Sequence, residues 1–286
     1  MEEITTSKIL YGNLRYNEVS MKAAHNSYQR DEILVDQIAW SPAQPFQGGC
    51  RALELDISQS SSGNDWSVGH KDSYDRNYRQ LSQFLNELSV WSRNNVKHDV
   101  ITVHLDLKHV EAGFVQKLDE YIRNNLHVGT ITSVYVPGEL MGREASLPRG
   151  AEVNGWPTLD QLTGRFIFCV TGNSKAKDFY SRTTPKSRLC FADKDVSDSD
   201  RNDPSSDVCV FFNYNLFSAN INKWGPVFRR LAGSKKVITR GYVLNGDDLW
   251  KAALENGCHL LATDKIRNHN WAMAGRTPFV KLRPLL

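Results

Sequence analysis

Four segments in the first 110 residues place polar, chemically competent side chains within or just after apolar runs. The segments are Val19–Tyr28, Arg51–Ile57, Trp66–His70 and Ile101–Lys108. Their reactive side chains are His25, Asn26, Glu54, Asp56, His70, Asp106 and Lys108. Carboxylate and amide oxygens are ligands for a hard divalent cation, and two histidines can serve as one general base and one general acid. Together these groups could activate a hydroxyl, neutralise negative charge and protonate a leaving group.

The two acids of the second segment carry the strongest signal. Because side chains alternate along a strand, Glu54 and Asp56 share one face, while Leu53, Leu55 and Ile57 share the other. Two buried carboxylates on one face repel each other and lose hydration, at a cost on the order of several kcal/mol unless a cation or donors compensate. The solvated face of an edge strand is the alternative interpretation. The acid and amide of neighbouring segments favour a cation site, for calcium first and magnesium second.

These side chains need a framework that brings successive segments to one edge. Short apolar runs predict strands at Val19–Ala24, Ala52–Ile57, Trp66–His70, Val100–Leu107, Arg165–Val170, Val208–Phe212, Val237–Arg240 and His259–Ala262. Amphipathic stretches predict helices at Leu81–Ser92, Phe114–Asn124, Asn222–Leu231 and Asp247–Glu255. Strands that alternate with helices predict parallel pairing, and eight such units in 286 residues favour a closed (β/α)8 barrel of the TIM type, an α/β fold. Active sites of such barrels lie at the carboxyl ends of the strands.

Two long segments interrupt this pattern. Thr130–Pro157 contains four glycines and three prolines, and Thr171–Asp207 is rich in Ser, Asp, Lys and Arg. Both lie inside the series of strands, so we expect long surface loops rather than linkers. The composition does not shift along the chain and no internal repeat is present. The sequence therefore predicts one domain over residues 1–286.

Composition limits the classes of protein to which the chain can belong. It is 40% hydrophobic and 23% charged, as in a globular protein with a substantial core, and its net charge of +3 predicts no general attraction to nucleic acid. We expect no transmembrane segment and no secretory signal, hence a cytoplasmic protein or one exported by a non-classical route that acts at membrane surfaces. The five unclustered cysteines favour reduced core thiols over disulfides or a zinc site.

Seven short motifs carry a resemblance to a known family. They are Leu14-Arg15-Tyr16-Asn17, His25-Asn26-Ser27-Tyr28, Arg51–Asp56, Gly69-His70, Gly155–Leu159, Thr239-Arg240 and Ala262–Asp264. The chain resembles the calcium-dependent bacterial phosphatidylinositol-specific phospholipases C, phosphodiesterase barrels related to the X domain of eukaryotic phosphoinositide phospholipases C. The resemblance covers most of the chain. It is strongest in the first 110 residues and is lost over residues 173–207.

The resemblance implies a role for each matching residue. His25 would be the base that takes the proton of the inositol 2-hydroxyl, and His70 would be the acid that protonates the departing diacylglycerol oxygen. Calcium would be held by Asn26, Glu54, Asp56 and Asp106. The cation would lower the pKa of the 2-hydroxyl and offset charge in the transition state. The products would be diacylglycerol and 1,2-cyclic inositol phosphate, because the nucleophile belongs to the substrate.

Other charged residues near these motifs have two interpretations. Lys108 and Arg240 can bind the substrate phosphate or ring hydroxyls, or they can form salt bridges with the acids. The family commonly has Glu where this chain has Asp106, which shortens one metal ligand. His104 and His109 bracket Asp106, but no family motif includes them and we interpret both as structural.

Two other functions remain as alternatives. Phospholipase D-like, sphingomyelinase D-like and glycerophosphodiester phosphodiesterases use the same barrel and also pair two histidines with Glu-x-Asp and a later Asp. The motif that begins at His25, with its upstream Leu14–Asn17, argues against them. An inactive inositide-binding module is the second alternative, which the presence of both histidines disfavours. No Gly-x-Ser-x-Gly motif and no glycine-rich phosphate loop occurs.

The expected partner is phosphatidylinositol or a related phospholipid, met at a membrane surface by a monomer in peripheral contact. Tyr135–Pro137, Leu140-Met141, Trp40 and Phe46 could contact lipid. The alternative is that they pack beneath their own loops, and we favour that arrangement. The motifs leave open whether the headgroup is plain, phosphorylated or glycosylated inositol.

Overall fold

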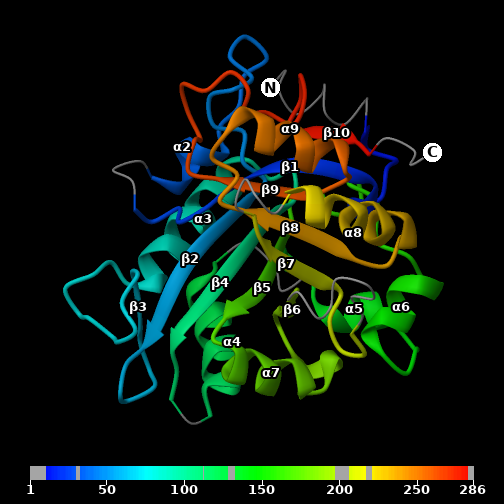
Figure 1. Ribbon diagram of the computed structural model, residues 1–286. Helices are drawn as coiled ribbons and strands as arrows, with labels where there is room; N and C mark the ends of the chain where they lie inside the picture. The colour runs from blue at the N-terminus through cyan, green and yellow to red at the C-terminus, as the bar shows by residue number, and fades with distance from the viewer. Residues whose placement is uncertain are drawn as a thin grey trace.

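A closed barrel of parallel strands forms the centre of the molecule (Figure 1). The computed structural model describes residues 11–29, 33–111, 113–127, 133–196, 206–216 and 221–282. The barrel strands are β1 (Val19–Ala24), β2 (Ala52–Gln59), β4 (Ile101–His109), β5 (Phe166–Gly172), β6 (Phe191–Asp195), β7 (Phe211–Asn215), β8 (Ile238–Tyr242) and β9 (Leu260–Thr263). Each pairs in parallel with the next, β9 pairs with β1, and the pairing of β1 with β2 closes the ring. The predicted TIM-type barrel is confirmed.

Two further strands lie antiparallel to the barrel. Trp66–Val68 (β3) forms a hairpin with β2, and Phe279–Lys281 (β10) pairs with β1. The prediction that Trp66–His70 is a barrel strand was therefore wrong. The barrel strand that the sequence analysis missed is β6, within the segment expected to be a loop. Its second half, Asp193-Lys194-Asp195, is polar because it reaches the mouth of the barrel, and this breaks the apolar run by which strands are detected.

Helices cover the outside of the barrel (Figure 1). They are α2 (Leu34–Ile38), α3 (Leu81–Asn94), α4 (Phe114–Asn125), α5 (Pro137–Met141), α6 (Leu147–Val153), α7 (Ser174–Arg182), α8 (Ile221–Ser234) and α9 (Asp247–Glu255). The four predicted helices, now α3, α4, α8 and α9, are confirmed to within three residues at each end. The segments predicted to be loops contain α5, α6 and α7, so that prediction was wrong for the described residues. The predictions of a single domain and of two long loops also include residues 1–10, 130–132 and 197–205, which lie outside the described residues.

The barrel interior changes character along its axis. Near the amino ends of the strands it is apolar, and Phe191 and Phe211 lie there with ring centroids 5.3 Å apart. Two and four residues further along β2 from the buried Ala52, the same face carries Glu54 and Asp56. The apolar half thus forms the floor on which the polar half is built. All five cysteines are free and buried, as expected.

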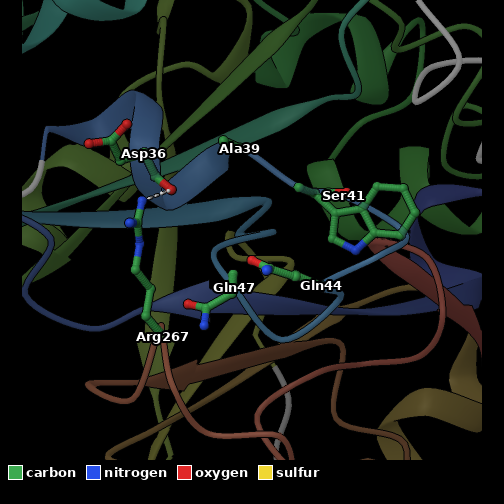
Figure 2. Close-up of a pocket in the computed structure, with 7 residues that line it drawn as sticks. Asp36, Ala39, Ser41, Gln44, Gln47 and Arg267 are labelled. Carbon is green, nitrogen blue, oxygen red and sulfur yellow. Dashed lines mark hydrogen bonds between the residues drawn. The ribbon is translucent and has the colours of Figure 1, made fainter.

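Most of the side chains considered for lipid contact are packed into the protein, although Phe46 and Val136 are only half-buried. Tyr135, Leu140 and Met141 are buried, and the Tyr135 ring stacks on Phe191 beneath the polar mouth. Trp40 is also buried, in the wall of a pocket of about 250 Å³ beside α2. Figure 2 shows this pocket, which is lined by Asp36, Ala39, Trp40, Ser41, Gln44, Gln47 and Arg267. Within the described chain, no helix has the length and apolar character needed to cross a bilayer.

Candidate active site

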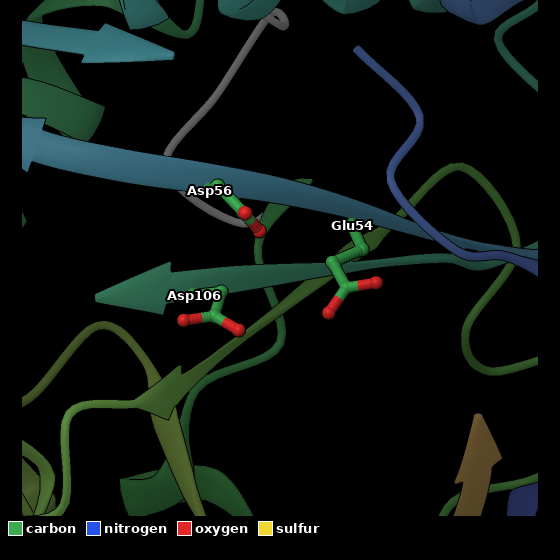
Figure 3. Close-up of side chains that lie close together, drawn as sticks. All are labelled: Glu54, Asp56 and Asp106. Atoms are coloured by element: carbon green, nitrogen blue, oxygen red, sulfur yellow. The ribbon is translucent and has the colours of Figure 1, made fainter. Parts of the chain in front are cut away.

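Three carboxylates converge at the mouth of the barrel (Figure 3). In the register of β2 with β4, Asp56 lies opposite Asp106, and Glu54 lies one pleat below on the same face. One oxygen from each of the three residues lies within 4.8 Å of the others. Glu54 and Asp56 are buried and Asp106 is half-buried. The structure therefore brings together the three acids that the sequence analysis assigned to a cation site.

The cluster is electrostatically strained. Burial, and then the charge of Asp56, raise the pKa of Asp106 to about 6, although Lys108 acts in the opposite direction. The Lys108 ammonium lies 3.2 Å from Asp56 Oδ2 and 3.3 Å from Asp106 Oδ1. Burial acts against this ammonium, but the neighbouring carboxylates raise its pKa overall. Asp56 and Asp106 thus share the single positive charge of Lys108, and a divalent cation would offset the remaining negative charge.

Asp56 shows how a cation would be accommodated. Its Oδ2 accepts a hydrogen bond of 2.7 Å from the Tyr28 hydroxyl and lies 2.7 Å from His70 Nδ1. Its Oδ1 is buried and has no hydrogen-bond partner among the described residues. A buried carboxylate oxygen without a partner is costly. The free oxygen and the all-oxygen donor set fit a hard cation such as calcium or magnesium.

Asn26 lies beside this cluster, directly after β1. Its backbone N–H donates to Glu54 Oε2 at 3.1 Å, and its side-chain oxygen accepts from the Tyr28 hydroxyl at 3.3 Å. Its φ of 51° is in the left-handed region, which asparagine tolerates better than most residues. The unusual backbone conformation turns the chain sharply at the rim of the barrel. It places an amide oxygen next to the acids, as the sequence analysis expected.

His25 is enclosed on several sides. Its Nδ1 lies 3.0 Å from Asp264 Oδ1, and its ring stacks on Tyr242 with centroids 5.8 Å apart. Its side chain is only 16% exposed, and its Nε2 lies 3.8 Å from Glu54 Oε2, beyond hydrogen-bond distance. A carboxylate can only accept, so Asp264 selects the tautomer with the proton on Nδ1. Nε2 is then an unprotonated nitrogen that faces the mouth of the barrel.

Asp264 and Tyr242 were not assigned roles from the sequence. Asp264 directly follows β9, in the motif Ala262–Asp264, so its position at a strand end was the available signal. Tyr242 is the last residue of β8, two residues after Arg240 and therefore on the same face. The positions of Asp264 and Tyr242 at strand ends identify them as site residues only when the boundaries of β8 and β9 are known.

His70 reaches the site by a different route from the one predicted. It lies two residues beyond β3, whose antiparallel direction returns the chain toward the middle of β2. Gly69 N–H donates to the Asp56 carbonyl at 2.9 Å, which fixes His70 beside the Asp56 side chain. The imidazole is 70% exposed. His70 thus joins the site through a hairpin and not at the carboxyl end of a barrel strand.

Arg240 is a buried residue of β8, on the side of the barrel opposite β4. Its Nη2 lies 2.8 Å from Glu54 Oε2, and its Nη1 donates to Asn213 Oδ1 at 3.0 Å. Burial acts against the guanidinium, but the charge of Glu54 helps to raise the pKa of Arg240 overall. Arg240 and Lys108 therefore both form the salt bridges that were the alternative to substrate contact.

The sequence analysis did not predict a second group of ion pairs, which lies at the β6 side of the barrel mouth. Lys177 of α7 lies 2.8 Å from Asp193 Oδ1 and 2.5 Å from Asp195 Oδ2. Burial raises the pKa of Asp193, while the Lys177 charge acts in the opposite direction. Both acids lie on β6, which the sequence analysis did not recognise as a strand.

The two histidines interpreted as structural lie in different surroundings. His104 is fully buried, with its ring edge-to-face with Phe211 at 6.2 Å. Burial, and then the charge of Arg240, hold the pKa of His104 well below its usual range. His109 lies at the end of β4, 3.0 Å from Glu111. In the register of β2 with β4, His104 lies opposite Glu54, and within the described residues its two ring nitrogens are buried without a hydrogen-bond partner. The structural interpretation of both histidines stays a prediction.

Comparison with protein families gives one match. Residues 68–209 match the family model described as phosphoinositide phospholipase C, Ca2+-dependent. The matched segment includes His70, Asp106 and Lys108. The other proposed site residues lie before or after it. A search of the curated proteins gives no match.

Solved structures match nearly the whole chain. The calcium-dependent phosphoinositol-specific phospholipase C from Pseudomonas sp. has a TM-score of 0.70 at 17% identity, covering 95% of this chain and 96% of that one. A structure of the same enzyme described as a myoinositol complex gives 0.70 at 17% identity, with 96% and 97% covered. The Ca2+-dependent phosphatidylinositol-specific phospholipase C from Streptomyces antibioticus gives 0.66 at 15% identity, with 87% and 94% covered. The predicted resemblance is confirmed in sequence over residues 68–209 and in fold over nearly the whole chain.

Proposed function

Because the chain resembles the Ca2+-dependent phosphoinositide phospholipases C in sequence and in fold, we propose that it is a phosphatidylinositol-specific phospholipase C. It would cleave the glycerol–phosphate bond to give diacylglycerol and 1,2-cyclic inositol phosphate. The observation that carries the proposal is the pair of histidine–carboxylate contacts, His25–Asp264 and His70–Asp56, on either side of one acidic cluster. We take residues 1–286 to form a single catalytic barrel that acts as a monomer in peripheral contact with a membrane.

His25 is the proposed general base. Its Nδ1–H is committed to Asp264, so Nε2 can take the proton of the inositol 2-hydroxyl. The charge that then develops on the imidazolium is stabilised by the Asp264 carboxylate, as in other carboxylate–histidine pairs. The Tyr242 ring limits rotation of the imidazole and restricts access of water to it.

His70 is the proposed general acid. Its Nδ1 is held by Asp56 Oδ2, which leaves Nε2 directed away from the buried cluster. When His70 is protonated, this nitrogen can donate to the departing diacylglycerol oxygen. Its exposure lets it exchange protons with water between turnovers. The same exposure places it where the lipid part of the substrate would leave the site.

Asn26, Glu54, Asp56 and Asp106 would hold calcium, with magnesium as the alternative. Bound there, the cation would supply charge neutralisation and lower the pKa of the 2-hydroxyl. Arg240 lies 2.8 Å from Glu54, and Lys108 lies 3.2 Å from Asp56 and 3.3 Å from Asp106, so the two cations offset part of the negative charge of the cluster. We propose that Lys108 and Arg240 also face the substrate phosphate or ring hydroxyls.

The proposal is tested by incubating the purified protein with phosphatidylinositol vesicles, with calcium or with chelator, while following phosphorus NMR. We expect the cyclic phosphate signal only with calcium, and its loss in His25→Ala and His70→Ala. His127→Ala is a matched control, because His127 is exposed and follows α4, outside the site. Phosphatidic acid or ceramide phosphate from a choline lipid would instead indicate a phospholipase D-like or sphingomyelinase D-like enzyme. Calcium binding without turnover of any lipid would indicate an inositide-binding module.

A further inference from the structure

The carboxylate that contacts His25 is itself held by another side chain. Asn245 Nδ2 donates to Asp264 Oδ2 at 2.6 Å, while Asp264 Oδ1 lies 3.0 Å from His25 Nδ1. Asn245 Oδ1 accepts from the Asp264 backbone N–H at 2.8 Å and from the Thr263 hydroxyl at 3.0 Å. Asn245, Asp264 and His25 therefore form a continuous chain of hydrogen bonds.

The orientation of the Asn245 amide is fixed by chemistry. A backbone N–H can only donate, so the atom of Asn245 that faces the Asp264 backbone must be the oxygen. The NH2 group then necessarily faces the carboxylate. One asparagine thus binds both the backbone and the side chain of Asp264, which defines the position of the carboxylate relative to β9.

Asp264 needs such a support because burial does not provide one. Its side chain is 37% exposed, whereas the Asp56 side chain that contacts His70 is 1% exposed. An exposed carboxylate can rotate and exchange its partner for water at little cost. A hydrogen bond to the second oxygen removes that freedom and keeps the first oxygen on His25.

The backbone before Asn245 is held in an unfavourable conformation. Val243 has a φ of 64°, in the left-handed region that β-branched residues rarely adopt. The turn is fixed by Leu244, which is fully buried and donates from its N–H to the Ala262 carbonyl at 3.0 Å. Conformations of this kind are unfavourable and persist where the surrounding structure determines them. The turn follows β8, is tied to β9 by the Leu244 hydrogen bond, and brings Asn245 to Asp264.

We propose that Asn245 is a positioning residue for the general base, acting through Asp264. It holds the carboxylate so that His25 keeps its proton on Nδ1 and presents Nε2 to the substrate hydroxyl. The proposal rests on the proposed function of His25. The end of β8 and the turn after it would then hold His25 by two contacts: the Tyr242 ring stacks on the imidazole, and Asn245 fixes the carboxylate that binds it.

The kinetic test is a double-mutant cycle, measured on phosphatidylinositol with calcium. Asn245→Ala should lower kcat roughly tenfold and leave KM unchanged, because the change removes support for the base and not a substrate contact. In an Asp264→Ala background, which alone should cost about 10³-fold, the same change should cost less than about twofold. Equal losses in both backgrounds would overturn the proposal. Asn125→Ala, which removes a side-chain hydrogen bond to the Tyr121 carbonyl at the end of α4, is the matched control.

A second readout does not depend on turnover. In protein labelled with 15N-histidine, two-bond correlations report which ring nitrogen of His25 carries the proton. Asn245→Ala should replace the Nδ1–H form by a mixture of tautomers, and Asn245→Asp, which keeps the side-chain shape but adds a second carboxylate, should do so more strongly. An unchanged tautomer in both variants would overturn the proposal even in an active enzyme. A changed tautomer in a protein that makes no cyclic phosphate would support the positioning contact and refute the proposed function.

Discussion

The two histidines of the site are held by the same kind of contact in opposite surroundings. Each presents Nδ1 to a carboxylate, at 3.0 Å for His25 and at 2.7 Å for His70. The His25 side chain is 16% exposed and its carboxylate partner is 37% exposed; the His70 side chain is 70% exposed and its partner is 1% exposed. At one histidine the ring is enclosed and the carboxylate is open. At the other the arrangement is reversed.

The difference matches the different demands on a base and an acid. A base that must take a proton from one hydroxyl gains from an enclosed ring whose orientation and tautomer are set by its neighbours. An acid that must be reprotonated after each turnover gains from contact with water. The supports differ accordingly, because Asp264 is fixed by hydrogen bonds and Asp56 is fixed by burial within the acidic cluster.

Removal of the enclosed histidine should have the largest effect. His25→Ala should lower kcat by about 10⁴-fold, at the upper end of the range for general acid–base catalysis. Added imidazole should not restore activity, because the cavity lies behind Tyr242 and Asp264. The rate of cyclic phosphate release, with and without imidazole, measures this. Restoration by imidazole would mean that the His25 side of the site is as open as the His70 side.

Removal of the exposed histidine should have a smaller effect that depends on the leaving group. His70→Ala should lower kcat by about 10²–10³-fold on phosphatidylinositol. Added imidazole should partly restore the rate, because the position is open to solvent. An inositol phosphate ester of p-nitrophenol, whose leaving group needs no proton, should be cleaved by this variant almost as well as by the parent protein. A loss of equal size on both substrates would exclude His70 as the acid.

Displacement of His70 without its removal should have a still smaller effect. A methyl group added at Gly69 would overlap the Tyr78 ring, so Gly69→Ala should shift the residues around His70 and leave His25 in place. We expect roughly a tenfold loss of kcat on phosphatidylinositol and little loss on the p-nitrophenol ester. Gly275→Ala, where the new methyl group would meet Val280 at an ordinary 3.5 Å, is the matched control. A similar loss on both substrates would show that the hairpin also positions the base.

The same comparison explains what the sequence could predict. Glu54, Asp56 and Asp106 lie within strands whose alternation is clear, so their shared face and their convergence followed from the pattern. His70 was assigned to the site but by the wrong route, because a short apolar run does not distinguish a hairpin strand from a barrel strand. The β6 acids were missed because a strand that ends in polar site residues has a weak apolar signal. Asn245 was missed because its contact depends on a strained turn at Val243, which no local pattern encodes.

The smallest effect should appear in the free energy of unfolding. It arises from the acidic cluster on the His70 side of the site, to which Asp56 and Asp106 both belong. The pKa of Asp106 is raised to about 6 in the folded protein, so between about pH 4 and pH 6 the folded state keeps a proton that the unfolded state has lost. Without calcium, the free energy of unfolding should therefore fall as pH rises through this window, by about 3 kcal/mol. Calcium should bind the ionised form and raise the melting temperature more at pH 7 than at pH 5. Asp106→Asn should flatten the pH dependence of the free energy of unfolding measured with chelator, and should reduce the rise in melting temperature that calcium causes. Asp247→Asn, at a half-buried acid paired with Lys251, should change neither. A calcium effect that is independent of pH would mean that Asp106 does not bind the cation, and the site would then rest on Glu54, Asp56 and Asn26 alone.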